Sequence, residues 1–237
     1  MLFVQSILDE YKFKIELHAH TSPVSRCSNI TPEYMVDTCL LAGCDAVVIT
    51  NHLGKFFMDG DATLRAAEYL DDDYKAKEIG KDRGLAVILG AEVSFTENFN
   101  DYLVYGIEPA DIERIIHCLD KGIEGFYREF KNDRNLILQA HPFRKKMELA
   151  PLSSIDGIET FNCHPAHNSK VGLAARYARE NSLIVSGGTD YHDDGDAGIC
   201  LMRSKRMPHD SYDIAEILKS RDVLFDISGS IIFPYGY

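Results

Sequence analysis

Short runs of apolar residues alternate with longer amphipathic stretches along this chain of 237 residues. The runs have the length of strands and are mostly continuous, as expected for strands that are covered on both faces. Strands are predicted at residues 14–18, 45–50, 85–91, 102–105, 136–140, 157–161 and 183–186, with a further candidate at 223–227.

Boundary residues and helical spacing of apolar side chains predict the helices between these runs. Thr31 and Pro32 are typical of an N-cap and a first helical residue, and Gly43 closes the helix that they open. Further helices are predicted at residues 62–83, 111–130, 168–180 and 212–219. The acidic triplet 71–73 lies within a helical stretch, and we interpret it as a solvated helix face.

Seven or eight strands that alternate with helices favour an α/β architecture with a parallel sheet. We expect a closed barrel rather than a doubly wound open sheet, because polar residues follow nearly every predicted strand. A barrel collects all strand C-termini around one ring, whereas an open sheet would concentrate them at one switch point. No change in composition marks a boundary, so residues 1–237 are predicted to form one domain.

Composition and charge narrow the function classes. The formal net charge is −12, which argues against a nucleic acid polymer or an anionic membrane surface as partner. The six cysteines form no CxxC pair and are expected to be reduced thiols in a cytoplasmic protein. Neither a signal peptide nor an apolar run long enough to span a membrane is predicted.

Candidate metal ligands follow the predicted strands. His18 and His20 end the first strand at i and i+2, so both imidazoles lie on one face and form a metal-binding pair. Histidine or a carboxylate follows most of the other strands, at His52, Glu92, His141, Glu159, Asp190 and His192, and Asp101 precedes the fourth strand. Because the strand ends of a barrel converge, these residues predict one shared metal site.

Taken in order, these segments resemble the PHP domain family of polymerases and histidinol phosphatases. The resemblance rests on Glu16-Leu17-His18-Ala19-His20-Thr21-Ser22, Ile49-Thr50-Asn51-His52, Gly90-Ala91-Glu92, Ala140-His141-Pro142, Gly157-Ile158-Glu159 with Asn162, and Gly188-Thr189-Asp190-Tyr191-His192. It implies a distorted (β/α)7 TIM-like barrel, two or three divalent metal ions at the strand C-termini, and hydrolysis of phosphoesters.

The resemblance also implies ligands for each ion. The first ion would take His18, His20, Glu92 and Asp190. Glu92 would bridge to a second, which His141 also binds. Asp101 stands in a slot where family members often have histidine, and a carboxylate there favours a harder cation such as manganese over zinc.

A third ion would take His52 and His192. Its remaining ligand in many relatives falls at the position of Arg26, whose guanidinium does not ligate metals, and Asn51 stands where the family has aspartate. We expect two ions and leave the third open, with manganese, zinc or iron as candidates.

The implied reaction is attack on phosphorus by a hydroxide that the cations hold, with Glu92, Asp190 and His192 as catalytic residues. Arg26 and Arg144 are assigned to the phosphate of a small phosphomonoester or phosphodiester, because guanidinium groups bind phosphate in a bidentate manner. Imidazoles must be neutral to ligate, so activity is expected to fall below roughly pH 6.

Two alternatives stay open. One is an amidohydrolase-like metal hydrolase acting on C–N bonds, although Gly-x-Glu at the third strand and Asp-x-His at the seventh fit the PHP family better. The other is a catalytically silent metal-binding PHP module. His164 and His167 are interpreted as ordinary loop residues, while Glu159 and Asn162 are candidates for supporting the ligands. The oligomeric state is left open.

Overall fold

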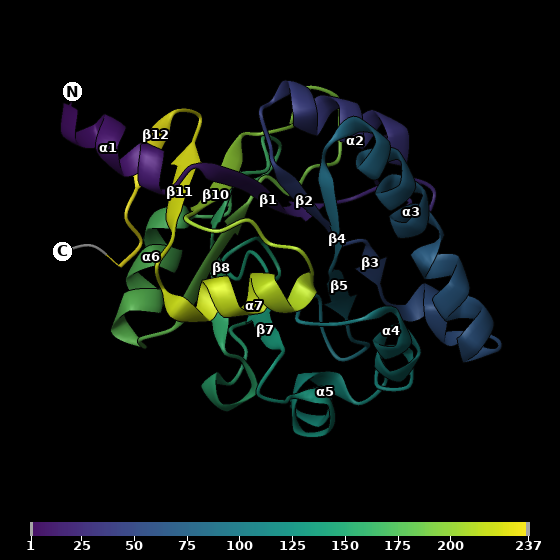
Figure 1. The fold of residues 1–237 in the computed structure, drawn as a ribbon. Helices are drawn as coiled ribbons and strands as arrows, with labels where there is room; N and C mark the ends of the chain where they lie inside the picture. Colours follow the sequence, from purple (N-terminus) through teal and green to yellow (C-terminus); the bar gives the residue numbers. More distant parts are fainter. Residues whose placement is uncertain (1, 236–237) are drawn as a thin grey trace.

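The strands of the computed structural model, which describes residues 2–235, form two six-stranded sheets (Figure 1). The first sheet contains, in spatial order, β12 (Ser230–Ile232), β11 (Leu224–Ile227), β10 (Cys200–Ser204), β1 (Phe13–Ala19), β2 (Ala46–Ile49) and β4 (Ala86–Leu89). The second contains β3 (His52–Leu53), β5 (Ala91–Ser94), β6 (Asp101–Tyr105), β7 (Leu136–Gln139), β8 (Gly157–Asn162) and β9 (Ile184–Gly188). Met1, Gly236 and Tyr237 of the predicted domain lie outside the described residues.

Every predicted strand position is occupied by a strand, but the run at 85–91 is divided. It forms β4 and β5 on either side of Gly90, and these two strands belong to different sheets. A Cβ at Gly90 would lie 2.8 Å from Cγ1 of Val48, so the neighbouring strand leaves room only for glycine at this break. β3, β10 and β12 were not predicted.

The expected parallel arrangement is wrong in both sheets. β6 is antiparallel to β5 and β7, β10 is antiparallel to β1 and β11, and β11 is antiparallel to β12. Residues 95–100, which connect β5 to β6, are too few for the crossover that a parallel pair requires. The reversal brings Asp101, the first residue of β6, beside Ser94 at the end of β5.

The predicted closed (β/α)7 barrel is not shown, because the strands divide between two sheets. Contacts nevertheless join the two sheets beside β1. Ala19 forms a parallel bridge with Tyr191, which follows β9. His20 N donates to the carbonyl of Tyr191, and Tyr191 N donates to the carbonyl of His18, each at 3.0 Å. The segments that carry the predicted ligands are thereby fixed to each other.

The helices flank the sheets, and α2 lies beside α3, which packs against β4 (Figure 1). Thr31 caps α2 by accepting from Tyr34 N, and α3 ends at Gly84 with φ +86°, so both predicted helices are confirmed. No described helix is both long and apolar enough to cross a membrane. The helices are α1 (Leu2–Glu10), which was not predicted, α2 (Pro32–Leu41), α3 (Ala62–Arg83), α4 (Pro109–Ile116), α5 (Gly122–Phe130), α6 (Val171–Glu180) and α7 (Ser211–Ser220), with 3-10 turns η1 (Lys55–Met58) and η2 (Leu152–Ser154).

The single helix predicted at 111–130 is two helices, α4 and α5. The chain turns between them, and Gly122, the first residue of α5, has φ +66°, a left-handed conformation that breaks a continuous α-helix. The carboxylate of Glu97 accepts a hydrogen bond from the backbone N of Ile123 at 2.9 Å, so a long-range contact fixes the start of α5. The helical spacing of apolar residues continues across the turn, so the sequence pattern did not indicate that the helix is interrupted.

The interpretation of the acidic triplet as a solvated face is wrong for two of its members. Asp71 is exposed, but Asp72 and Asp73 are buried. Asp72 accepts from the backbone N of Val24 at 3.2 Å, and Asp73 pairs with Lys77 at 2.7 Å. Asp72 therefore holds the loop after β1 against α3.

Both faces of β1 are buried, and they differ in chemistry. Ile15 and Leu17 point into the hydrophobic core. Glu16 and His18, which alternate with them, point to the opposite face and are equally buried. The β-strand period therefore delivers a row of polar side chains into the interior without interrupting the apolar core.

We predict that Gly188→Ala separates β9 from β1. The added Cβ would lie 2.5 Å from Cβ of His18 and 3.1 Å from Oε1 of Glu16. The free energy of unfolding should fall by about 1–3 kcal/mol, measured by denaturant titration. Gly172→Ala is the matched control, because its Cβ meets nothing within 4 Å and alanine favours α6 by up to about 1 kcal/mol. Equal stability of the two variants would contradict the close approach.

Candidate metal centre

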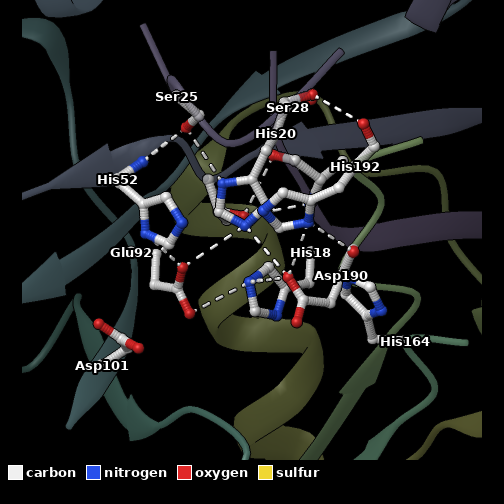
Figure 2. A network of polar contacts seen from close by, with 12 residues as sticks. His18, His20, Ser25, Ser28, His52, Glu92, Asp101, His164, Asp190 and His192 are labelled. Carbon is white, nitrogen blue, oxygen red and sulfur yellow. Dashed lines mark hydrogen bonds and ion pairs between the residues drawn. The ribbon is translucent and has the colours of Figure 1, made fainter. Parts of the chain in front are cut away.

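Glu92 on β5 lies at the centre of a ring of imidazoles. Its Oε1 is 3.3 Å from Nε2 of His18 and 3.1 Å from Nε2 of His141. Its Oε2 is 3.4 Å from Nε2 of His20 and 2.8 Å from Nδ1 of His52. Four histidines from three segments of the chain thus face one buried carboxylate, and Figure 2 shows three of them, His18, His20 and His52, beside Glu92.

Asp190 provides a second carboxylate to the same cluster. Its Oδ1 is 3.3 Å from Nε2 of His18, from Nε2 of His20 and from Nδ1 of His192. Its Oδ2 accepts hydrogen bonds from Arg144 and from Asn162. One oxygen of Asp190 therefore faces the imidazoles, while its neighbours hold the other.

The outer part of the cluster contains three imidazoles packed against each other. The ring centroid of His20 is 4.4 Å from that of His52 and 4.2 Å from that of His192 (Figure 2). One nitrogen from each of these three rings lies within 4.8 Å of the others. His18, His20 and Glu92 form a second such group.

These residues fit a divalent cation. Among the described residues, four of their buried atoms have no partner in hydrogen-bond geometry: His18 Nε2, His20 Nε2, Glu92 Oε2 and His141 Nδ1. Burying a polar atom without a partner is costly, and these atoms belong to the residue types that hold zinc and manganese. The donor set, rather than any single contact, indicates a metal centre.

Asp101 lies at the edge of this cluster. Its Oδ2 is 3.9 Å from Nε2 of His141, and Ser94 donates a hydrogen bond to its Oδ1. It forms a potential metal-binding group with His52 and Glu92 (Figure 2). The antiparallel direction of β6 places this first residue of the strand beside ligands that follow parallel strands.

Glu159 on β8 orients two of the histidines. Its Oε1 is 2.7 Å from Nδ1 of His18, and its Oε2 accepts from the backbone N of His141 at 3.0 Å and from Asn162 at 2.9 Å. If His18 Nδ1 carries the proton toward Glu159, its Nε2 presents a lone pair to the centre. Glu159 and Asn162 thus occupy the supporting position for which they were candidates.

The electrostatics of the cluster balance carboxylates against imidazoles. Desolvation alone would lower the pKa of His18, but Glu159, Asp190 and Glu92 outweigh it and raise that pKa well above 6.5. Desolvation likewise opposes the charge of Glu92, and the His18 and His52 cations hold its pKa well below 4.5. Burial and the nearby His52 lower the pKa of His20. Protons therefore supply the positive charge that a metal ion would otherwise supply.

A cavity of about 790 Å³ opens onto the cluster, and His52, Glu92, Asp190 and His192 form part of its lining. Basic side chains surround it at Arg144, Lys145, Lys146 and Lys170. Arg144 lies at the predicted place, although its guanidinium already contacts Asp190, Asn162 and Ser169.

Arg26 does not lie with the other predicted site residues. Its guanidinium stacks over Phe56 at 3.6 Å from the ring centroid, and it lines a separate depression of about 730 Å³. The structure therefore separates it from Arg144, with which the sequence analysis had grouped it. Arg26 is close in sequence to His18 and His20, but the loop after β1 turns outward at this residue. Its side chain therefore points away from the cluster.

Three residues near the cluster carry a different role from the one the sequence suggested. Asn51 does not face the metal ligands, because its amide binds Thr21 and Ser25 in the loop after β1. His164 and His167 were interpreted as ordinary loop residues, but both line the cavity, and His164 groups with Asp190 and His192. Their position after β8, a ligand-bearing strand, was the available signal.

Cys27 also lines the cavity, next to His52 and His192. Burial would raise the pKa of its thiol, but hydrogen bonds with His192 and His52 outweigh burial and lower that pKa to about 6. From the sequence, Cys27 was interpreted only as one of six reduced thiols. All six cysteines are free in the structure.

A family model described as the PHP domain matches residues 16–228. A search of curated protein sequences found no significant match. Solved structures with a similar fold include a two-domain protein from Bacteroides vulgatus that contains a predicted PHP-like metal-dependent phosphoesterase. It has 17% identity and a TM-score of 0.63 over 91% of this chain, which spans only 64% of that protein.

Two further structures are similar at the level of the fold. PsfC from Pseudomonas syringae has 17% identity and a TM-score of 0.56, with 80% of this chain and 81% of PsfC covered. An amidohydrolase from Chromobacterium violaceum, solved with bound sulfate and no metal, has 16% identity and a TM-score of 0.51, with 78% of this chain and 89% of that chain covered.

We predict that Glu159→Gln weakens metal binding by about 10–100-fold. An amide has one acceptor oxygen, so it cannot serve His18 and the donors of His141 and Asn162 together. Calorimetric titration with Mn²⁺ or Zn²⁺ measures the affinity, and Glu180→Gln on the exposed face of α6 is the control. Unchanged affinity in Glu159→Gln would show that the carboxylate does not orient His18.

We predict that the affinity for metal increases as the pH is raised from 6.5 to 8. The pKa values of His18 and His52 are raised, so both are protonated near neutrality in the metal-free protein and must lose protons to ligate. Each displaced proton contributes about a tenfold gain in affinity per pH unit below the imidazole pKa. Titrations in buffers of different ionisation enthalpy count the released protons, and a flat affinity between pH 6.5 and 8 would contradict the prediction.

Proposed function

The chain belongs to the PHP domain family, and from that premise we propose that it is a metal-dependent hydrolase of a small phosphomonoester or phosphodiester. One observation carries the proposal: a buried cluster of unpartnered nitrogen and oxygen ligands opens into a cavity with a basic rim. The ligand cluster suits divalent cations, and the rim suits the negative charge of a phosphate group.

We assign two or three divalent ions to the cluster, with manganese, zinc or iron as candidates. His18, His20, Glu92 and Asp190 are the ligands of the first ion. Glu92 also serves the second, together with His141 and Asp101, whose oxygen atoms favour a harder cation. This assignment is supported by the two carboxylate oxygens of Glu92, which face different pairs of histidines.

The cations would supply an activated water molecule at neutral pH and neutralise charge on the phosphoryl oxygens. The chain provides binding and orientation. Lys145 and Lys146 lie on the cavity rim, where they attract a dianionic group, and Arg144 holds Asp190 while lining the same cavity. His192 serves either as a ligand or as the proton donor to the departing oxygen, because it lines the cavity beside Asp190.

We propose in addition that residues 1–237 form one domain whose seven central strands make a distorted (β/α)7 barrel. β2 leads into β3 and β4 into β5, so each pair continues from one sheet into the other. The bridge between Ala19 and Tyr191 links β1 to the segment after β9. These connections support an approximate ring in the order β1, β2/β3, β4/β5, β6, β7, β8 and β9.

Hydrolysis of a C–N bond is the second candidate, because an amidohydrolase is among the proteins of similar fold. The basic cavity rim favours an anionic phosphoester over a neutral amide. We propose a small phosphorylated substrate, with neither a membrane nor a nucleic acid polymer as partner, and a cytoplasmic location consistent with six free thiols.

We predict phosphate release from a panel of phosphomonoesters and phosphodiesters by the purified chain with added manganese or zinc. Glu92→Ala should lose bound metal and lower turnover by about 10³-fold or more, because it removes the carboxylate that four imidazoles share. Glu113→Ala, at a half-buried position of α4 outside the cluster, is the control and should keep both the bound metal and the turnover.

Amide substrates are assayed beside the phosphoesters. Turnover of amides alone would replace the proposal with the amidohydrolase function. Bound metal without turnover of either class would favour the silent module. Full phosphoesterase activity in metal-free Glu92→Ala would refute the mechanism.

A further inference from the structure

A second cavity lies on the side of β8 that α6 covers, away from the metal centre. The described residues enclose about 360 Å³ between β8, β9, α6 and the segment that follows β12. Figure 1 shows this C-terminal segment beside α6. The family model ends at residue 228, whereas Pro234 and Tyr235 line the cavity, so part of its wall lies outside the matched domain.

Tyr235 fixes the segment after β12 to the edge of the second sheet. Its hydroxyl accepts a hydrogen bond from the backbone N of Val185 at 2.7 Å. β9 ends the strand order of that sheet, so the tyrosine satisfies a backbone donor at an open edge. The guanidinium of Arg221 lies 5.3 Å from the Tyr235 ring centroid and donates to the carbonyl of Ser182 at 2.7 Å. Specific contacts therefore form this wall of the cavity.

The lining combines an apolar interior with a basic entrance. Leu183 and Val185 are buried and apolar. Arg179 and Arg221 line the same cavity, are exposed, and form no ion pair with a carboxylate of residues 2–235. Guanidinium groups bind carboxylate and phosphate groups in a bidentate manner. The lining therefore suits a small organic anion.

A buried hydroxyl in this cavity also lacks a partner. Thr160 lines the cavity and is 1% exposed, and its Oγ1 has no hydrogen-bond partner in the part of the chain that the structure describes. An unpartnered hydroxyl in an apolar interior costs free energy, which a bound polar group recovers. This observation is independent of the arginines, and it indicates a ligand with a hydrogen-bonding group at its buried end.

We propose that this cavity binds a small organic anion with an apolar body. Arg179 and Arg221 hold the anionic group at the entrance, the apolar side chains of α6 and β9 cover the body, and Thr160 hydrogen-bonds a polar group at the buried end. Binding is non-covalent. None of the residues that line this cavity is a predicted metal ligand, so the inference does not depend on the proposed function.

Calorimetric titration of the full-length chain with 8-hydroxyoctanoate tests the inference. This probe combines a carboxylate, an apolar chain that adapts to the shape of the cavity, and a terminal hydroxyl. We expect one binding site per chain. The uncharged 8-hydroxyoctanamide should bind about tenfold more weakly or worse, and octanoate, which lacks the hydroxyl, about 3–10-fold more weakly.

Three variants test whether the probe lies in this cavity. Ala175→Leu, at a half-buried position of α6, places a larger side chain in the cavity and should abolish binding. Arg179→Ala should weaken binding about tenfold. Arg176→Ala is its matched control, because it removes the same charge from the same helix at a residue that pairs with Glu180. In Thr160→Val, 8-hydroxyoctanoate and octanoate should bind equally well.

Lys146→Ala tests the other location, because Lys146 lies on the rim of the metal-centre cavity. We expect this variant to bind the probe as the native chain does. Loss of the probe in Lys146→Ala together with binding by Ala175→Leu would place the probe at the metal centre and overturn the inference.

Absence of binding to the native chain, or equal affinity of Arg179→Ala and Arg176→Ala, would also overturn the inference. Arg179 is exposed, so its variant tests the site even if Ala175→Leu does not fold. The metal content and turnover of Glu92→Ala test the proposed function separately, and neither depends on this cavity.

Discussion

The structure depends on one electrostatic constraint: Glu92 and Asp190 are buried carboxylates that face imidazoles rather than water. Removing such charges from water costs several kcal/mol each unless opposite charge is close by. Protonated histidines meet this need in the metal-free protein, and divalent cations meet it with fewer protons. The same constraint explains why metal affinity, pH and the local geometry are coupled in this protein.

The fold satisfies the constraint with residues that are far apart in the chain. Strand periodicity turns Glu16 and His18 inward while Ile15 and Leu17 join the core. Parallel strands deliver their C-terminal residues to one place, and the antiparallel β6 contributes its first residue there. Glu159 then contacts Nδ1 of His18, and Ser25 Oγ lies 3.2 Å from Nδ1 of His20, so the imidazoles of this pair are oriented before any ion binds.

The sequence predicted those parts of the molecule that local patterns determine. The capped helix after Thr31, the apolar strands and the histidines and acids at their ends are local features, and the structure brings the ligands together. Strand direction, the turn before Gly122 and the burial of Asp72 depend on contacts with distant segments, and the sequence did not reveal them. The directions of Arg26, Cys27 and His164 were missed for the same reason, since each lies on a loop whose path is set by tertiary contacts.

The central claim is that histidines and carboxylates from separate strands hold divalent cations together. Anomalous diffraction from crystals of the chain grown with manganese or zinc tests it most directly, because it locates each ion relative to its ligands. We predict anomalous peaks among His18, His20, Glu92 and Asp190. Crystals that contain the metal but show no peak within coordination distance of Glu92 would contradict it.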